Sequence, residues 1–197
     1  MLNKKCDKLF FLTFLMFLIM IKKLIPFLFF LPFLSACRKA ETGFEMTYER
    51  RQFDIPVGTD AARSFNINLL NISSDTAVFF NINNANSGQL VGVVPRSMNL
   101  KMRFQGSGSN FAIIDRIEVA IFDPNRKNTT DETPIFYRFD VPLSTGDVLT
   151  LIPDGNNVSK YILGLKTFNV HIKFIFREIV PRTIEAEANM VFLAKTS

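Results

Sequence analysis

The stretch FNVHIKFIFRE, residues 168–178, alternates apolar and polar side chains with a period of two. This period is typical of a strand with one face in the core and one face in water. The following stretch, TIEAEANMVFLAK at 183–195, alternates in the same way, and Pro181 lies between the two. Because proline interrupts a strand interior, we expect a long antiparallel hairpin that turns near Pro181 and sets Arg177 opposite Glu185.

Similar alternation recurs upstream, and clusters of turn-forming residues separate the stretches. The stretches are FEMTYER (44–50), SFNINLLNI (64–72), TAVFFNIN (76–83), QLVGVV (89–94), NLKMRF (99–104), IDRIEVAIF (114–122), IFYRFDV (135–141) and DVLTLI (147–152).

One short helix is expected at 157–163, with Asn157 as its N-cap and Gly164 as its C-cap. The sequence thus predicts about ten short strands with no alternation of strands and helices. We therefore expect residues 44–197 to form an all-β domain, an antiparallel two-sheet β-sandwich of immunoglobulin-like or jelly-roll-like type.

The positive charge of the chain is concentrated near its N-terminus. The formal net charge is +5 at pH 7, but residues 1–36 contain five lysines and only one aspartate. Residues 37–197 are therefore close to neutral, and this balance argues against nucleic acid as a partner.

Two apolar blocks, 9–21 and 24–36, flank Lys22 and Lys23. Neither block has the length of about 20 residues that a membrane-spanning helix needs. Read from Met20, the order is a basic start, an apolar block and small residues, which is typical of a signal peptide. We expect translation to start at Met20 and residues 1–36 to be removed; a genuine long leader is the alternative.

The tetrapeptide Leu34-Ser35-Ala36-Cys37 ends the second apolar block. It resembles the lipobox of bacterial lipoproteins, and this resemblance implies cleavage before Cys37 and acylation of Cys37. Two or three acyl chains hold a protein stably on a membrane. The alternative is an ordinary signal peptide.

Residues 37–43 would form the lipidated N-terminus and a tether. The only other cysteine is Cys6, so the exported domain would contain no disulfide. Arg38 and Lys39 follow Cys37, whereas some lipoproteins of Bacteroidota, which this composition resembles, carry an acidic surface-export run there. We therefore expect an outer-membrane protein that faces the periplasm rather than the cell surface.

Few residues indicate catalysis or cofactor binding. His171 is the single histidine, and it lies on the polar side of its strand, as a solvated side chain would. We expect no catalytic residue, no cofactor and no metal; the weak calcium candidates are Asp123, Asn125, Asp131 and Glu132, which lack regular calcium-loop spacing. Tryptophan is absent and the aromatic residues are mostly Phe, so carbohydrate is not favoured.

Some strands are apolar on both faces, which implies cover by another part of the chain or by a partner. The candidate docking residues are Phe79, Ile175, Val191 and Leu193. We expect a non-enzymatic accessory subunit of an outer-membrane protein complex. The alternatives are a solitary module that binds a glycan or hydrophobic molecule, and a hydrolase with an unrecognised site.

Overall fold

The computed structural model describes residues 43–104, 110–126 and 130–197. The chain divides into two units, residues 1–41 and 42–197, and the described elements lie in the second unit. Cys37 and the signal-processing residues Leu34, Ser35 and Ala36 therefore lie outside the described residues. Within the described ranges, no helix has the length and apolar character needed to span a membrane.

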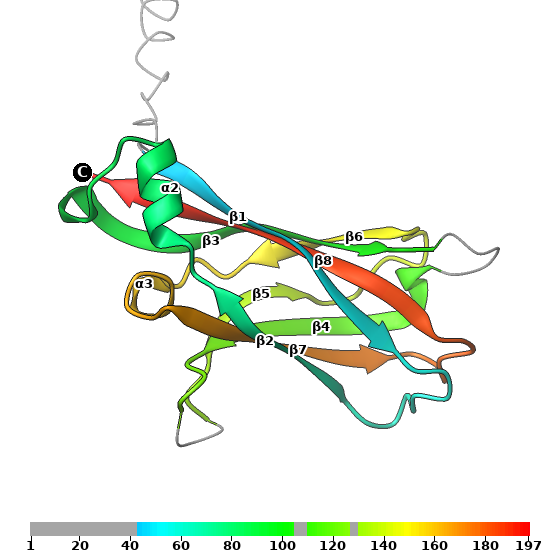
Figure 1. The fold of residues 1–197 in the computed structure, drawn as a ribbon. Coiled ribbons are helices and arrows are strands. Elements are labelled where there is room, and N and C mark those ends of the chain that lie inside the picture. Colours follow the sequence, from blue (N-terminus) through cyan, green and yellow to red (C-terminus); the bar gives the residue numbers. More distant parts are fainter. Residues whose placement is uncertain (1–42, 105–109, 127–129) are drawn as a thin grey trace, which may run out of the picture. The chain divides into compact units, whose positions relative to one another are not determined.

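Eight strands and four short helical segments make up the described part of the chain (Figure 1). The strands are β1 (Gly43–Ile55), β2 (Phe65–Ser73), β3 (Leu90–Met102), β4 (Ile114–Phe122), β5 (Thr133–Arg138), β6 (Val148–Pro153), β7 (Thr167–Phe176) and β8 (Ile184–Thr196). The helices are α2 (Thr76–Ile82), η2 (Ser87–Gln89), η3 (Phe111–Ile113) and α3 (Ser159–Ile162).

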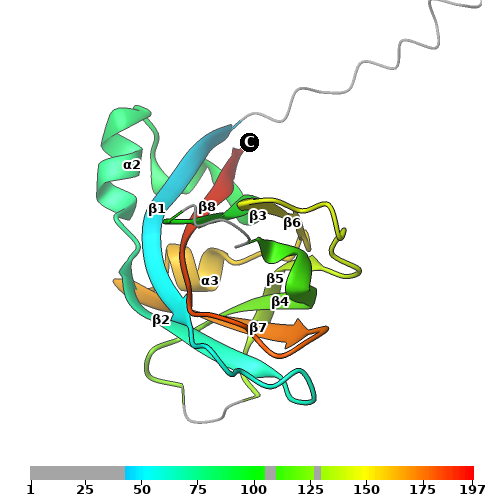
Figure 2. The ribbon, with the colours of Figure 1, turned by 90° about the vertical axis from the view of Figure 1, so that its right-hand side faces the viewer.

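All eight strands belong to one antiparallel sheet in the order β1-β8-β3-β6-β5-β4-β7-β2. The sheet curls around the core into a nearly closed barrel-like wall, as the end-on view shows (Figure 2). Strands β5 and β6 join its two halves through only two residue pairs, Phe136 with Pro153 and Tyr137 with Ile152. The all-β prediction is confirmed, but the two-sheet sandwich of about ten strands is wrong because this link makes the two halves one sheet.

Two upstream predictions are also corrected. The stretch 76–83, expected as a strand, forms α2 (Thr76–Ile82), whose half-buried Phe79 and Phe80 pack against the core. The two strands expected at 89–94 and 99–104 are one continuous strand, β3. Helix or strand is ambiguous for a short apolar run, since both place some of its side chains against a core.

The expected hairpin of β7 and β8 is wrong. Strand β7 pairs with β2 and β4, whereas β8 pairs with β1 and β3. Arg177 donates to the carbonyl oxygens of Ala112, Ile114 and Val141, and Glu185 lies 3.5 Å from Arg103. The chain crosses between opposite walls after β7.

The inner faces of β7 and β8 nevertheless meet across the core. The ring centroids of Phe168 and Phe192 lie 6.4 Å apart at 81°, an edge-to-face arrangement. Phe174 of β7 also packs against Phe53 of β1, with ring centroids 5.9 Å apart and the ring planes tilted by 37°. The alternation of apolar residues therefore identified the core faces correctly, although it did not identify the hydrogen-bonded neighbours.

The two edge strands each contain a bulge that an asparagine side chain stabilises. Arg50 of β1 has φ 53°, and its N–H donates to Asn189 Oδ1 at 2.8 Å. Asn71 of β2 has φ 54°, and its N–H donates to Asn169 Oδ1 at 2.7 Å. Such bulges bend an edge strand and interrupt its row of free backbone groups.

Helix α3 is shorter than the expected 157–163, and its caps are Val158 and Leu163 rather than Asn157 and Gly164. Asn157 still orders the start of the helix, because its Oδ1 accepts from the N–H and hydroxyl of Ser159 at 2.9 and 2.6 Å. The Ser159 Oγ in turn accepts from the Val93 N–H at 2.8 Å and so ties the helix to β3. Tyr161 and Ile162 are buried, so α3 contributes to the core between β3 and β7.

Candidate functional site

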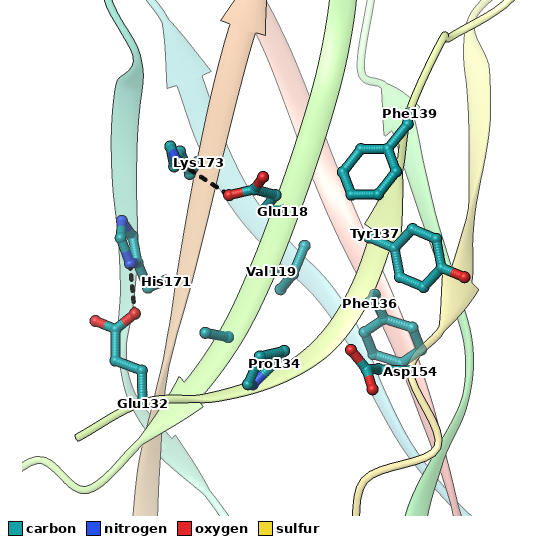
Figure 3. Close-up of a pocket in the computed structure, with 11 residues that line it drawn as sticks. Glu118, Val119, Glu132, Pro134, Phe136, Tyr137, Phe139, Asp154, His171 and Lys173 are labelled. Carbon is teal, nitrogen blue, oxygen red and sulfur yellow. Dashed lines mark hydrogen bonds and ion pairs between the residues drawn. The ribbon is translucent and has the colours of Figure 1, made fainter. Parts of the chain in front are cut away.

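A groove of about 570 Å³ lies on the outer side of the sheet, over β4, β5 and β7 (Figure 3). Its lining comes from three adjacent strands, from the residues that flank β5 and from Asp154, which follows β6. The lining residues are Glu118, Val119, Ala120, Glu132, Pro134, Phe136, Tyr137, Phe139, Asp154, His171 and Lys173.

A bulge between β4 and β5 accompanies the groove. Val119 pairs with Phe136 and Ala120 pairs with Pro134, so Ile135 is an extra residue in β5. Proline has no N–H to donate to a ladder, which makes it tolerable at such a break. Because the Ala120 side chain is only a methyl group, it leaves the wall open at this point.

One flank of the groove is a hydrogen-bonded polar cluster around His171. Its Nδ1 lies 2.9 Å from Glu132 Oε2, and its Nε2 lies 3.0 Å from Asn66 Oδ1. Glu132 also binds the Arg126 guanidinium, which lies over the Phe122 ring at 3.7 Å from its centroid. Both ring nitrogens of His171 are therefore engaged, and the side chain is not the freely solvated histidine that the sequence predicted.

The electrostatics of this cluster favour an ionised Glu132. Burial by itself would raise the pKa of Glu132, but the hydrogen bonds from His171 and Arg126 and their charges outweigh it. The pKa of Glu132 is therefore lower than its ordinary value of 4.5. The ionised carboxylate holds the positions of His171 and Arg126 beside the groove.

A second polar pair lies beside this cluster on β4 and β7. Lys173 Nζ donates to Glu118 Oε2 at 3.0 Å, and Arg116 lies 4.0 Å from the other oxygen of Glu118. Both side chains of the close pair are more than one-third exposed, so the pair adds little stability. Its effect on the groove is to place one ammonium and one carboxylate on the same wall.

The opposite flank is aromatic. The rings of Tyr137 and Phe139 lie 5.1 Å apart at 32°, and the Arg116 guanidinium lies 4.9 Å from the Phe139 centroid. Phe139 is 47% exposed, and Ile152, opposite Tyr137 on β6, is 39% exposed. Asp154 follows β6 at this end, and no described side chain binds its carboxylate.

Hydrogen bonds and ion pairs within the protein engage three of the four calcium candidates. Asp123 Oδ1 accepts from the Asn125 N–H at 2.7 Å, which closes a turn, and Glu132 is bound by Arg126 and His171. Asp131 is exposed. In the part of the chain that the structure describes, no three His, Cys, Asp or Glu side chains form a group that could hold a metal ion.

The four candidate docking residues do not form one exposed surface. Phe79 lies on α2 rather than on a strand, and its half-buried ring packs at 5.7 Å from the Tyr48 ring. Leu193 is buried, whereas Ile175 and Val191 are half-buried on the outer side of β7 and β8.

Sequence reasoning missed the groove because its residues come from four segments that are distant along the chain: 118–120, 132–139, 154 and 171–173. Of its lining, the sequence singled out Glu132 as a weak calcium candidate and His171 as a solvated histidine. A usable signal was Pro134, since proline within an otherwise strand-like stretch indicates a bulge or an edge. The residues that lie opposite such a bulge, however, depend on which strands pair, and the sequence does not give this.

No family model matches this chain, and no curated protein matches it. Among solved structures, a chain of Desmodium yellow mottle tymovirus aligns over 79% of this chain and 90% of that chain, with 9% sequence identity and a TM-score of 0.25. At this TM-score the likeness carries no argument about fold or function.

Proposed function

We propose that this protein is a lipid-anchored binding module of the bacterial cell envelope. Residues 1–36 act as the export signal, and acylated Cys37 holds the domain on the periplasmic face of the outer membrane. The support for this address is the lipobox-like tetrapeptide behind a basic and apolar leader.

The groove over β4, β5 and β7 is the observation that carries the binding role. Its volume of about 570 Å³ lies within the range of roughly 300–1,000 Å³ that is typical of small-molecule sites. Such sites combine an apolar surface with a few polar groups in defined positions. Here Pro134, Tyr137 and Phe139 supply the apolar surface, with Asp154 beside them, and the other polar groups lie on the facing flank.

The charges of the groove favour a neutral or cationic ligand, and its aromatic flank favours a ligand with one flat apolar face. Three carboxylates line the groove, those of Glu118, Glu132 and Asp154, against one lysine, Lys173, and His171. An apolar face would stack on Tyr137, and hydroxyl or amino groups would donate to Asp154, whose carboxylate no side chain of the described residues binds. A sugar or amino sugar meets these requirements, although the absence of tryptophan argued against it.

Binding accounts for the paired titratable groups better than catalysis does. Glu118 is bound by Lys173, and Glu132 is bound by His171 and Arg126. A general acid or base must reach the substrate with a free position, whereas groups that hold one another in place suit a preorganised recognition surface.

The test is ligand-dependent thermal stabilisation of the purified full-length lipoprotein in mild detergent. The probes are a panel of neutral and amino sugars and their disaccharides, with fatty acids as a second panel. A ligand at 100 times its Kd stabilises the folded state by about 2.7 kcal/mol. We expect stabilisation by a sugar, its loss in Phe139→Ala and its retention in Leu143→Ala, which removes an exposed side chain outside the groove. Equal stabilisation of both variants would contradict binding in the groove.

A second candidate is an accessory subunit of an outer-membrane complex that docks over the same surface. The observation in its favour is the exposure of two apolar side chains at this flank, Phe139 of the groove lining and Ile152 of β6. This candidate predicts that a protein partner co-purifies in stoichiometric amount with the wild type and is lost from Phe139→Ala. A protein that purifies alone and binds a sugar would exclude it.

A further inference from the structure

Twenty consecutive residues, 76–95, carry no charged side chain. They comprise α2, η2 and the first part of β3. Three of their aliphatic side chains are largely exposed: Val78 at 54%, Ile82 at 71% and Val91 at 67%. Exposed aliphatic side chains in an uncharged segment indicate contact with an apolar or interfacial environment.

This uncharged segment lies at the end of the domain where β1 begins (Figure 1). The Phe80 ring of α2 meets the Phe44 ring of β1 edge-on, with centroids 5.9 Å apart. Residues 83–85 and Gln89 line a hollow of about 300 Å³ together with Gly43, Phe44 and the C-terminal residues Thr196 and Ser197. The segment and the start of β1 therefore form one continuous end of the domain.

The number of residues between Cys37 and β1 sets an upper limit on the distance from the anchor to this end of the domain. Gly43 is the sixth residue after Cys37. A chain spans at most about 3.3–3.6 Å per residue, so Gly43 lies within roughly 21 Å of Cys37. The other end of β1 lies about 40 Å further along the strand, at about 3.3 Å per residue.

We propose that residues 76–91 rest on the lipid surface that holds Cys37, with Val78, Ile82 and Val91 in the headgroup region. This inference rests on the proposed lipid anchor. Because the segment has no charged side chain, its contact with lipid would not remove any of its own charges from water. Arg38 and Lys39, next to Cys37, would attract anionic headgroups and draw this end toward the bilayer.

The test uses the full lipoprotein, produced with its leader and reconstituted in vesicles of phosphatidylethanolamine and phosphatidylglycerol. The chain after Cys37 contains no cysteine, so one introduced cysteine can be labelled uniquely with an environment-sensitive fluorophore. The labelled variants are Ile82→Cys and Val91→Cys, and the matched control is Val57→Cys. Val57 is 59% exposed and follows the far end of β1.

We expect a blue shift at positions 82 and 91 on reconstitution, and loss of their fluorescence when the vesicles contain a spin-labelled lipid. Position 57 should show neither effect. Two positions on different elements guard against a variant that does not fold. Equal quenching at all three positions, or none at 82 and 91, would overturn the inference.

Flotation of the same samples separates the two proposals. A protein that floats with the vesicles but keeps position 82 in water refutes the lipid contact and leaves the anchor intact; cover of this end by a partner protein would give that result. A protein that does not float refutes the anchor, and the lipid contact with it.

Discussion

Replacing Tyr48 by phenylalanine removes one buried hydroxyl and leaves the surrounding aromatic packing in place. Tyr48 of β1 is 2% exposed, and its hydroxyl donates to the Ser74 carbonyl oxygen at 2.7 Å. Its ring makes edge-to-face contacts with Phe79, Phe168 and Phe192 at centroid distances of 5.7, 5.2 and 5.8 Å. Tyr48 thus connects β1 to α2 and to both walls of the core.

The Tyr48→Phe variant keeps these ring contacts but leaves the Ser74 carbonyl without its hydroxyl donor. An unpaired buried acceptor costs about 1–3 kcal/mol of unfolding free energy. For a domain of this size each kcal/mol lowers Tm by about 2–4 °C. The Tyr48→Ala variant loses the ring as well and should lose about 3–5 kcal/mol.

The difference between wild type and Tyr48→Phe should also depend on pH. Burial raises the pKa of Tyr48 above its ordinary value of 10.0, and the nearby Asp75 carboxylate adds to the rise. Above pH 10 the unfolded chain releases this proton while the folded chain retains it, so the wild type loses about 1.4 kcal/mol per pH unit. The variant has no such proton, and the gap should narrow between pH 10 and pH 11.

Urea unfolding at pH 8, 10 and 11 measures both effects. The control is Tyr137→Phe on the outer wall, which should stay within about 0.5 kcal/mol of the wild type. A Tyr48→Phe variant as stable as the wild type at pH 8 would refute the role of the hydroxyl. A gap that stays constant to pH 11 would refute its burial.

Two other predictions test the site and the topology. In Glu132→Gln, the stability that the lowered pKa of Glu132 contributes is removed. The wild type should therefore be more stable than the variant above pH 4.5, and it should lose this advantage as the pH falls through the lower, folded-state pKa of Glu132. Urea midpoints from pH 3 to 7 would show this change. A stability difference at pH 3 equal to that at pH 7 would contradict the pairing with His171. The double variant Asn99→Cys with Asn189→Cys should form a disulfide, because these residues are directly paired on β3 and β8. Lys173 and Asn189 would be neighbours only if β7 and β8 formed a hairpin, so the double variant Lys173→Cys with Asn189→Cys should stay reduced in a thiol assay.

Local patterns were sufficient to locate most strands and their core faces. The period of two in 168–178 reflects the alternation of side chains across a strand, which is a property of the strand itself. This period identified Phe168 and Phe174 as core residues before any partner was known, and the same period in 183–195 identified Phe192. The same reasoning failed at 76–83, since Phe79 and Phe80 reach the core equally well from one face of a short helix.

The candidate site was much less predictable than the core. The groove depends on the bulge at Ile135, on the small Ala120 and on outward side chains from β4, β5 and β7. These residues can form a ligand site only when the three strands lie side by side. His171 illustrates the point, because its partners Glu132 and Asn66 are 39 and 105 residues away along the chain.

The sequence by itself determined the all-β class, the strand faces and the composition of the core, because these follow from side-chain periodicity within a few residues. Only the tertiary structure decided that β7 and β8 lie in opposite walls and that β5 and β6 join the halves into one sheet. An isolated strand offers the same backbone donors and acceptors to any neighbour, and its apolar face can meet another either beside it or across the core. That choice depends on packing across the whole domain, and the groove exists as a consequence of it.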